Sequence, residues 1–97
     1  MVQIHPCPYY HSMYYTYVLL SKKDNKFYIG FCENLVKRMK EHNKGIVKAT
    51  KNRRPLILFY YESCLDKKDA IAREKYFKTG FGRRFLKERN KSYFKRY

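Results

Sequence analysis

Two short segments near the start of the chain alternate apolar and polar residues, and a polar run separates them. The segments cover 14–21 and 26–31, and the run between them is Lys22-Lys23-Asp24-Asn25. This pattern predicts two antiparallel strands joined by a hairpin turn. With this loop, Tyr17 lies opposite Gly30 and diagonal to Tyr28 on one side of the sheet. We call that side the tyrosine face. It is the candidate working surface, because the opposite side collects the apolar residues of a core, and Gly30 leaves room for the Tyr17 ring.

The pattern changes to a helical period after the second strand. Asn34 is a predicted N-cap and Gly45 a predicted C-terminal stop. Between them, Arg38 and His42 lie one turn apart on one edge of the apolar stripe. We therefore expect both side chains at the boundary between core and solvent, where they can lean over the tyrosine face.

The second half of the chain predicts a third strand and two further helices. Residues 55–62 form a nearly continuous apolar and aromatic run with a proline only at its first position, which predicts a buried strand. Asp66 is a predicted cap of a helix that runs to about Thr79. A short basic helix is expected at 83–90. We expect residues 1–12 to be a flexible extension, residues 13–90 to be the domain, and residues 91–97 to be a basic tail.

The composition points to a polyanionic partner. The 97 residues include 23 Lys and Arg against 8 Asp and Glu, a formal net charge of +15, together with 19% aromatic residues. Nucleic acid is the expected partner, because phosphates neutralise such charge and rings can stack on bases. A membrane is not expected, since no segment approaches the ~20 apolar residues of a spanning helix and the N-terminus lacks the order of a signal peptide.

The cysteines indicate a reducing environment. Cys7, Cys32 and Cys64 are odd in number and show no CxxC spacing, so neither a disulfide framework nor a structural zinc site is predicted. His5 and His11 flank Cys7, but the set lacks a fourth ligand. A cytoplasmic protein fits best.

One acidic residue interrupts the apolar stripe of the second helix. Glu74 lies one turn from Ala70 and three residues from both Ile71 and Phe77. A carboxylate directed at a core must be paired with a cation, protonated or bound to a metal. The pattern alone favours a salt bridge to a neighbouring Lys or Arg, with a metal site as the alternative.

Five elements in order resemble the GIY-YIG nuclease superfamily. They are Tyr15-Thr16-Tyr17, Tyr28-Ile29-Gly30, Arg38, His42 and the pair Arg73-Glu74. The likeness covers Met13 to about Leu86 and is greatest to small stand-alone members related to the nuclease domain of the bacterial excision-repair incision subunit. The resemblance implies an α+β fold with a three-stranded antiparallel sheet flanked by helices. It also implies hydrolysis of DNA phosphodiesters with one divalent metal ion, Mg²⁺ or Mn²⁺.

The sequence departs from the family pattern at three places. Tyr15-Thr16 replaces Gly-Ile in the first motif, and Phe31 stands where some members carry a lysine. An asparagine found near the end of the domain in some members has only Asn90 as a weak counterpart.

The resemblance implies a role for each motif residue. Glu74 would hold the metal, and Arg38 would grip the scissile phosphate through its guanidinium fork. A tyrosine can act as general base only when nearby positive charge favours its phenolate. We favour Tyr28 slightly over Tyr17 for that role. His42 would orient the phenol or relay its proton.

Basic residues outside the motifs are expected to contact phosphates. They are Lys48, Lys51, Arg53 and Arg54 in the loop after the first helix, and Arg83, Arg84 and Lys87 in the last predicted helix. For the loop, solubility is the simpler interpretation. Selectivity would come from DNA shape, such as a flap, nick or branch met in repair or recombination, or from a protein partner. Two other classes stay open: a non-catalytic nucleic-acid-binding module, and an interaction subunit that another chain delivers to DNA.

Overall fold

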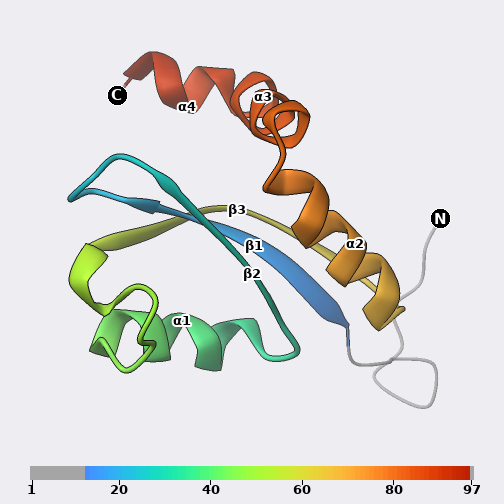
Figure 1. The fold of residues 1–97 in the computed structure, drawn as a ribbon, viewed down its shortest axis with the longest axis horizontal. Coiled ribbons are helices and arrows are strands. Elements are labelled where there is room, and N and C mark those ends of the chain that lie inside the picture. Colours follow the sequence, from blue (N-terminus) through green and yellow to red (C-terminus); the bar gives the residue numbers. More distant parts are fainter. Residues whose placement is uncertain (1–12, 97) are drawn as a thin grey trace, which may run out of the picture.

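The structure, a computed structural model, describes residues 13–96 and consists of one small sheet and its helices (Figure 1). The strands are β1 (Tyr14–Ser21), β2 (Phe27–Cys32) and β3 (Leu56–Cys64). The helices are α1 (Leu35–Lys44), the 3-10 turn η1 (Lys51–Arg53), α2 (Lys67–Phe77), α3 (Gly80–Arg89) and α4 (Lys91–Arg96). The predictions for residues 1–12, including the histidines around Cys7, lie outside the described residues.

The sheet confirms the predicted fold class and the predicted hairpin register. Its strand order is β2-β1-β3, and both pairings are antiparallel. The amide of Ser21 donates to the carbonyl of Lys26, and Tyr17 pairs with Gly30. Tyr17 and Tyr28 therefore share the tyrosine face, as the parity of the loop predicts.

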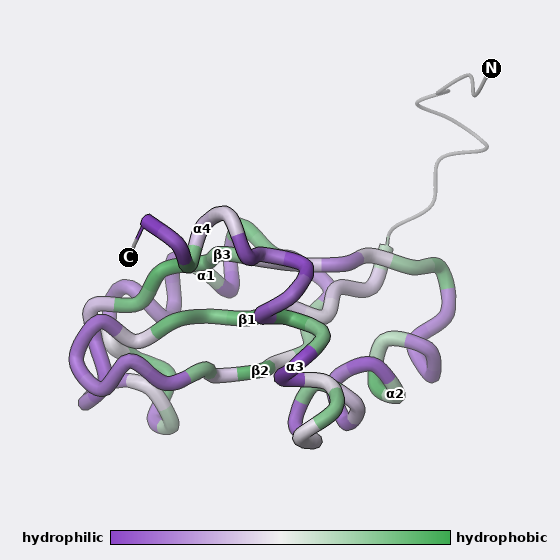
Figure 2. Tube along the Cα trace, turned by 90° about the horizontal axis from the view of Figure 1, so that it is seen from above, coloured by the Kyte–Doolittle hydropathy of each residue, from purple (hydrophilic) through white to green (hydrophobic). Residues whose placement is uncertain are grey.

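Helices cover both faces of the sheet, with α1 on one side and α2, α3 and α4 on the other (Figure 1). On the side of α2, the hydroxyl of Thr16 donates to the carbonyl of Ala70 at 2.8 Å. The core lies between the sheet and the helices on this side, where Val18 and Ile29 meet Phe77 and Leu86. Figure 2 shows hydrophobic segments in the strands and a mixture of hydrophobic and hydrophilic colours along the helices. Among the described helices, only α1 packs over the tyrosine face.

The predicted caps Asn34, Gly45 and Asp66 are confirmed, whereas α3 begins at Gly80, three residues before the predicted start. The side chain of Asn34 accepts from the amide of Lys37, and Asp66 caps α2 by accepting from Lys68. Gly45 ends α1 with φ of 78°, a left-handed conformation that costs glycine little. These caps fix where α1 begins and ends, and with it the positions of Arg38 and His42.

Two parts of the chain differ from the prediction. The third strand was expected to be buried, but β3 is an edge strand with alternating exposure, and Tyr61 is 51% exposed. Where a basic tail was expected, α4 forms and its Phe94 ring lies 6.0 Å from Phe27 and 5.6 Å from Phe59. The reason is that Phe94 covers apolar surface which the edge strands leave open.

Candidate active site

The ring of Tyr17 is fully buried between the sheet and α1. The space that it occupies exists because Gly30, its cross-strand partner, has no side chain. A Cβ atom at residue 30 would lie 2.4 Å from both Cζ and the hydroxyl oxygen of Tyr17. The glycine of the second motif therefore sets the position of the tyrosine of the first.

The Tyr17 hydroxyl is the first member of a buried polar chain. Its oxygen lies 2.8 Å from Nε2 of His42, and Nδ1 of the same imidazole lies 2.7 Å from Oγ1 of Thr50. Both His42 and Thr50 are almost completely buried. The prediction of His42 at the boundary with solvent was wrong, because the turn after α1 folds back and Thr50 covers the imidazole. Thr50 was not identified from the sequence, where a single threonine in a basic loop gives no signal.

Arg38 joins the same chain from its solvent side. Its Nε donates to the Tyr17 oxygen at 3.3 Å, and its Nη1 lies 3.2 Å from a carboxylate oxygen of Glu41. The Arg38 side chain is 35% exposed, so the predicted boundary position is confirmed. Tyr17 and Glu41 fix the position of the guanidinium, which is still partly exposed. It can therefore bind an anion that approaches the tyrosine face.

Burial sets the protonation states of this cluster. It raises the pKa of Tyr17 to about 12, although the hydrogen bond and charge of Arg38 act in the opposite direction. It also lowers the pKa of His42 to about 4, with the positive charge of Arg38 adding to the effect. At neutral pH the cluster thus contains a phenol, a neutral imidazole and a guanidinium.

A neutral imidazole allows two proton arrangements in the chain from Tyr17 to Thr50. In one, the phenol donates to Nε2 and the Nδ1 hydrogen is donated to Thr50. In the other, Thr50 donates to Nδ1, and the Tyr17 oxygen accepts hydrogen bonds from both His42 and Arg38. The second arrangement favours negative charge on Tyr17, because two donors then face its oxygen.

Tyr28 lies beside this cluster but is more accessible. Its ring centroid is 6.4 Å from that of Tyr17 and 5.4 Å from that of His42. The residue is only half-buried, whereas Tyr17 has no exposed surface. The structure therefore brings Tyr17, Tyr28, Arg38 and His42 together, and Tyr28 is the tyrosine that solvent can reach.

Glu74 lies on the other side of the sheet, on the flank of α2. Its carboxylate accepts from Nζ of Lys78 at 3.2 Å and its side chain is 23% exposed, so the expectation of a carboxylate directed at the core is corrected. The buried line of α2 is Ala70 and Phe77, and Glu74 is displaced from it by about half a right angle. The simpler alternative raised by the sequence, a salt bridge to a neighbouring lysine, is present.

The flank that carries Glu74 is the one nearest β2. Lys67, two turns earlier on the same flank, places Nζ 5.9 Å from the centroid of the Phe31 ring of β2. On the opposite flank, Arg73 forms two hydrogen bonds of 2.8 Å with Glu62 of β3. Glu74 can therefore approach the tyrosine face only around the β2 edge of the sheet.

The side chains present fit a divalent ion that is held by few protein ligands. Within residues 13–96, no three His, Cys, Asp or Glu side chains gather as a ligand set. Mg²⁺ is commonly held by one or two carboxylates, with waters and substrate phosphates completing its shell. A partly exposed carboxylate whose ion-pair partner is the exposed ammonium of Lys78 suits that mode of binding.

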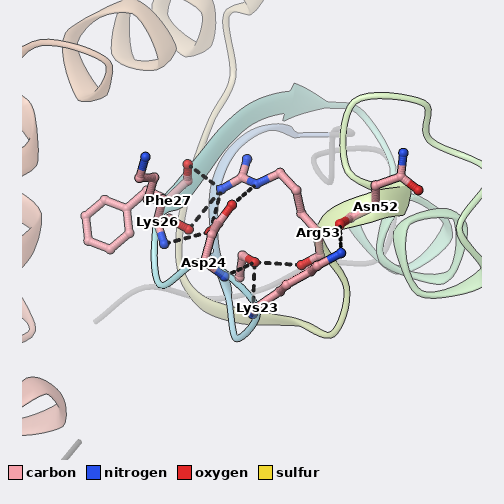
Figure 3. A network of polar contacts seen from close by, with 7 residues as sticks. Lys23, Asp24, Lys26, Phe27, Asn52 and Arg53 are labelled. Atoms are coloured by element: carbon pink, nitrogen blue, oxygen red, sulfur yellow. Dashed lines mark hydrogen bonds and ion pairs between the residues drawn. The ribbon is translucent and has the colours of Figure 1, made fainter.

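Two of the residues predicted to contact phosphates also form hydrogen bonds within the chain. The guanidinium of Arg53 donates to both carboxylate oxygens of Asp24, at 2.7 and 3.2 Å, and to the carbonyls of Lys26 and Phe27 (Figure 3). It ties the loop after α1 to the β1–β2 hairpin. Arg54 donates to the carbonyls of Lys51 and Asn43, and its guanidinium lies against Gly45. The sequence places both arginines in a basic loop and gives no indication of these hydrogen bonds.

The remaining basic candidates are exposed and lie on two separate parts of the molecule. Lys48 and Lys51 follow α1, whereas Arg83, Arg84 and Lys87 project from α3. Asn90, the weak family counterpart, caps α3 by donating from its amide to the carbonyl of Leu86 at 2.8 Å. No helix in the described part of the chain is long and apolar enough to cross a membrane.

Comparison with known proteins agrees with this fold. The family model described as GIY-YIG catalytic domain matches residues 13–91, so the chain belongs to the GIY-YIG family, which indicates a nuclease-type hydrolase in general. Members of this family generally use a divalent metal ion.

Small bacterial proteins are similar to the chain over most of this range. A UPF0213 protein of Pediococcus pentosaceus is 46% identical over 66 residues, 67% of this chain and 68% of the relative. One from Clostridium perfringens is 43% identical over 67 residues, 68% of this chain and 71% of the relative. UPF0213 protein YazA of Bacillus subtilis is 47% identical over 57 residues, 58% of each chain. No solved structure matches the chain significantly.

Proposed function

We propose that the chain is a divalent-metal-dependent DNA endonuclease that hydrolyses phosphodiester bonds at structures such as flaps, nicks or branches. The observation that carries the proposal is the contact of Arg38 with the Tyr17 oxygen beside half-buried Tyr28 and neutral His42. An accessible cation and a half-buried phenol, held beside a buried neutral imidazole, are groups that phosphodiester hydrolysis can use.

Arg38 binds the scissile phosphate in this proposal. Its half-exposed guanidinium offers charge-assisted hydrogen bonds to the non-bridging oxygens and stabilises the negative charge that grows on the phosphorane. Glu41 holds the side chain at a fixed angle, since its carboxylate pairs with Nη1 at 3.2 Å. Lys48 and Lys51 then contact phosphates further along the same strand.

Tyr28 is the proposed general base. Tyr28 is only half-buried, whereas Tyr17 has no exposed surface and a pKa raised to about 12 by burial. As a phenolate, Tyr28 removes a proton from the attacking water while the water oxygen bonds to phosphorus and the bond to the 3′ oxygen breaks. Tyr17, fixed by His42 and Thr50, holds Arg38 in place and is a positioning residue.

Glu74 would hold the divalent ion, Mg²⁺ or Mn²⁺, and this ion would supply positive charge for the departing oxygen. For that task the substrate must reach the β2 edge of the sheet, where Glu74 lies. We propose a role in DNA repair or recombination, with a protein partner as a second means of targeting.

We propose a cytoplasmic location, because Cys32 and Cys64 are free thiols that a reducing compartment preserves.

Cleavage of matched substrates tests the function. Flap, branched, nicked, single-stranded and intact duplex DNA are compared with Mg²⁺, with Mn²⁺ and with EDTA. We expect metal-dependent cutting of the flap or branch that Arg38→Ala abolishes. If the wild-type protein binds these substrates but cuts none with either metal, the chain is a non-catalytic nucleic-acid-binding module.

A further inference from the structure

The helix α3 carries an exposed aromatic residue on the side of the molecule away from the tyrosine face. Phe81 is 72% exposed, the largest exposed fraction among the described large hydrophobic residues. One turn later, Phe85 stacks on Phe77 with ring centroids 6.0 Å apart and so belongs to the inner part of the domain. Folding of the domain thus accounts for Phe85 but not for Phe81.

Phe81 forms one wall of a shallow hollow that also contains the half-exposed ring of Tyr76. The other walls are mostly basic, with Arg84, Arg89 and Lys91, and include one carboxylate, Glu88, which pairs with Lys91 at 3.5 Å. The guanidinium carbon of Arg84 lies 5.6 Å from the centroid of the Phe81 ring. Aromatic rings and cations therefore alternate over a single surface.

This surface continues into a row of cations. Arg83 and Lys87 line two adjoining hollows, one shared with Arg84 and the other with Lys26 of the hairpin. Among the ion pairs of residues 13–96, none includes Arg83, Arg84 or Lys87. Although Glu88 also lines the hollow shared by Arg83, Arg84 and Lys87, its ion pair is with Lys91, so these three cations are available to an external anion.

We propose that the aromatic and basic surface of α3, made of Tyr76, Phe81, Arg83, Arg84 and Lys87, binds an unpaired strand of DNA. Bases of a duplex are stacked on each other and hide their faces, so an exposed ring can stack only on a base that is unpaired. The cations beside Phe81 suit the phosphates on either side of that base. The proposal rests on the proposed function for the choice of DNA as substrate, and it adds a single-stranded part to that substrate.

Other occupants fit the charge less well. The centre of a protein interface is usually poor in charged residues, whereas cations surround Phe81 on this surface. A second copy of the chain would bring another +15 against this row of cations. A polyanion with flat apolar faces matches both features.

The location separates this surface from the cleavage chemistry. Helix α1, with Arg38 and His42, covers one face of the sheet, and α3 lies beyond the other (Figure 1). One DNA molecule can therefore occupy both only if it presents two differently directed segments. A flap or branch with a single-stranded arm has that form.

A single tryptophan reports on stacking at this position. The chain has no tryptophan, so Phe81→Trp introduces a single tryptophan at an exposed site, and its fluorescence can be followed. In EDTA, we expect an oligothymidylate to quench its emission, and expect little quenching by a blunt duplex or by heparin at equal charge. Equal quenching by heparin, or none by the oligothymidylate, would overturn the proposal.

Binding of the labelled oligothymidylate by anisotropy gives the second measurement. We expect Phe81→Ala to weaken it about tenfold while duplex affinity stays within about twofold, and Phe81→Tyr to retain it. Leu65→Ala, which changes another exposed apolar residue, is the matched control. An equal loss for both DNA forms, or a wild-type dimer in sedimentation that Phe81→Ala dissociates, would contradict the proposal.

Failure of the proposed nuclease function gives a different result. In that case the wild-type protein cuts no substrate, yet Phe81→Ala still weakens single-strand binding. If cutting is present and Phe81→Ala changes no affinity, only the single-strand surface is wrong. Melting curves of each variant confirm that it is folded.

Discussion

The hydroxyl oxygen of Tyr17 lies 2.8 Å from Nε2 of His42, and neither residue has appreciable exposed surface. The strand and the helix that carry them are joined here by a buried polar contact instead of apolar packing alone. Because an unpaired buried polar group is costly, this contact holds α1 in one position over the tyrosine face. The accessible groups, Arg38 and Tyr28, depend on it.

Gly30→Ala should displace Tyr17. The added Cβ would lie 2.4 Å from the Tyr17 hydroxyl oxygen, so either the buried ring or the strand must shift. We expect a loss of about 1–3 kcal/mol of stability in urea unfolding, together with loss of cleavage. Gly80→Ala is the control, since nothing lies within 4 Å of its added Cβ. Wild-type stability of Gly30→Ala would show that Tyr17 is not confined in this way.

Thr50→Val should leave Nδ1 of His42 without its partner. Valine has nearly the shape of threonine, so the change removes a hydrogen bond of 2.7 Å and little volume. We expect a loss of about 1–3 kcal/mol in denaturant unfolding and a changed tautomer of His42 in ¹⁵N spectra. Thr50→Ser should restore both. Identical spectra for wild type and Thr50→Val would contradict the role of Thr50.

The stability of the domain should fall in mild acid because of His42. Its folded pKa of about 4 lies below the ordinary value of 6.5, so the unfolded chain binds the proton more readily. The contribution is present above pH 6.5 and is lost as the pH falls toward 4, with a total of about 3 kcal/mol at most. Urea unfolding at steps of pH measures this loss.

The His42→Gln variant should keep its free energy of unfolding between pH 6.5 and 5, because it has no imidazole at this position to bind a proton. Arg73 lowers the pKa of Glu62, and Arg53 lowers that of Asp24, so these groups lose stability only at more acidic pH. Titration of the His42 ring by proton NMR gives a direct check. A midpoint near 6.5 would mean that the imidazole is not buried as described.

Glu74→Gln should abolish cleavage with little effect on stability. Lys78, its partner, is 54% exposed and can return to water, so the lost ion pair is worth about 0–1 kcal/mol. We expect DNA binding in EDTA to persist and the Mn²⁺ titration to lose its response. Arg38→Ala is the comparison, which should stop cleavage while retaining metal affinity. Cleavage at the wild-type rate by Glu74→Gln would refute Glu74 as the metal ligand.

Arg53 and Lys87 should differ in what they affect. Arg53→Ala removes the bonds to Asp24 and to two carbonyls, so we expect a lower melting temperature and little change in the salt dependence of DNA binding. Lys87→Ala should leave the melting temperature unchanged and reduce the log-log salt slope by about 0.9. If Arg53→Ala instead lowers the salt slope and leaves the melting temperature unchanged, Arg53 contacts phosphates.

Much of the fold is predictable from local pattern. Alternation and a four-residue loop are enough to place Tyr17 opposite Gly30, and Asn34, Gly45 and Asp66 mark helix ends by their own chemistry. The edge position of β3 is not predictable in this way. A run of apolar residues is compatible with a central or an edge strand, and the order β2-β1-β3 decides between them.

The residue types that meet across the hairpin and along α1 can be read from the chain, because those positions follow from periods of two and 3.6 residues. Three other relationships could not be read in this way: Thr50 bonds to His42, Arg53 pairs with Asp24, and Glu74 lies on α2, across the sheet from Tyr17. Each of these depends on how segments distant in sequence pack against each other. Periodicity carries no information about such contacts, since desolvation and pairing are decided by the neighbour that the fold supplies.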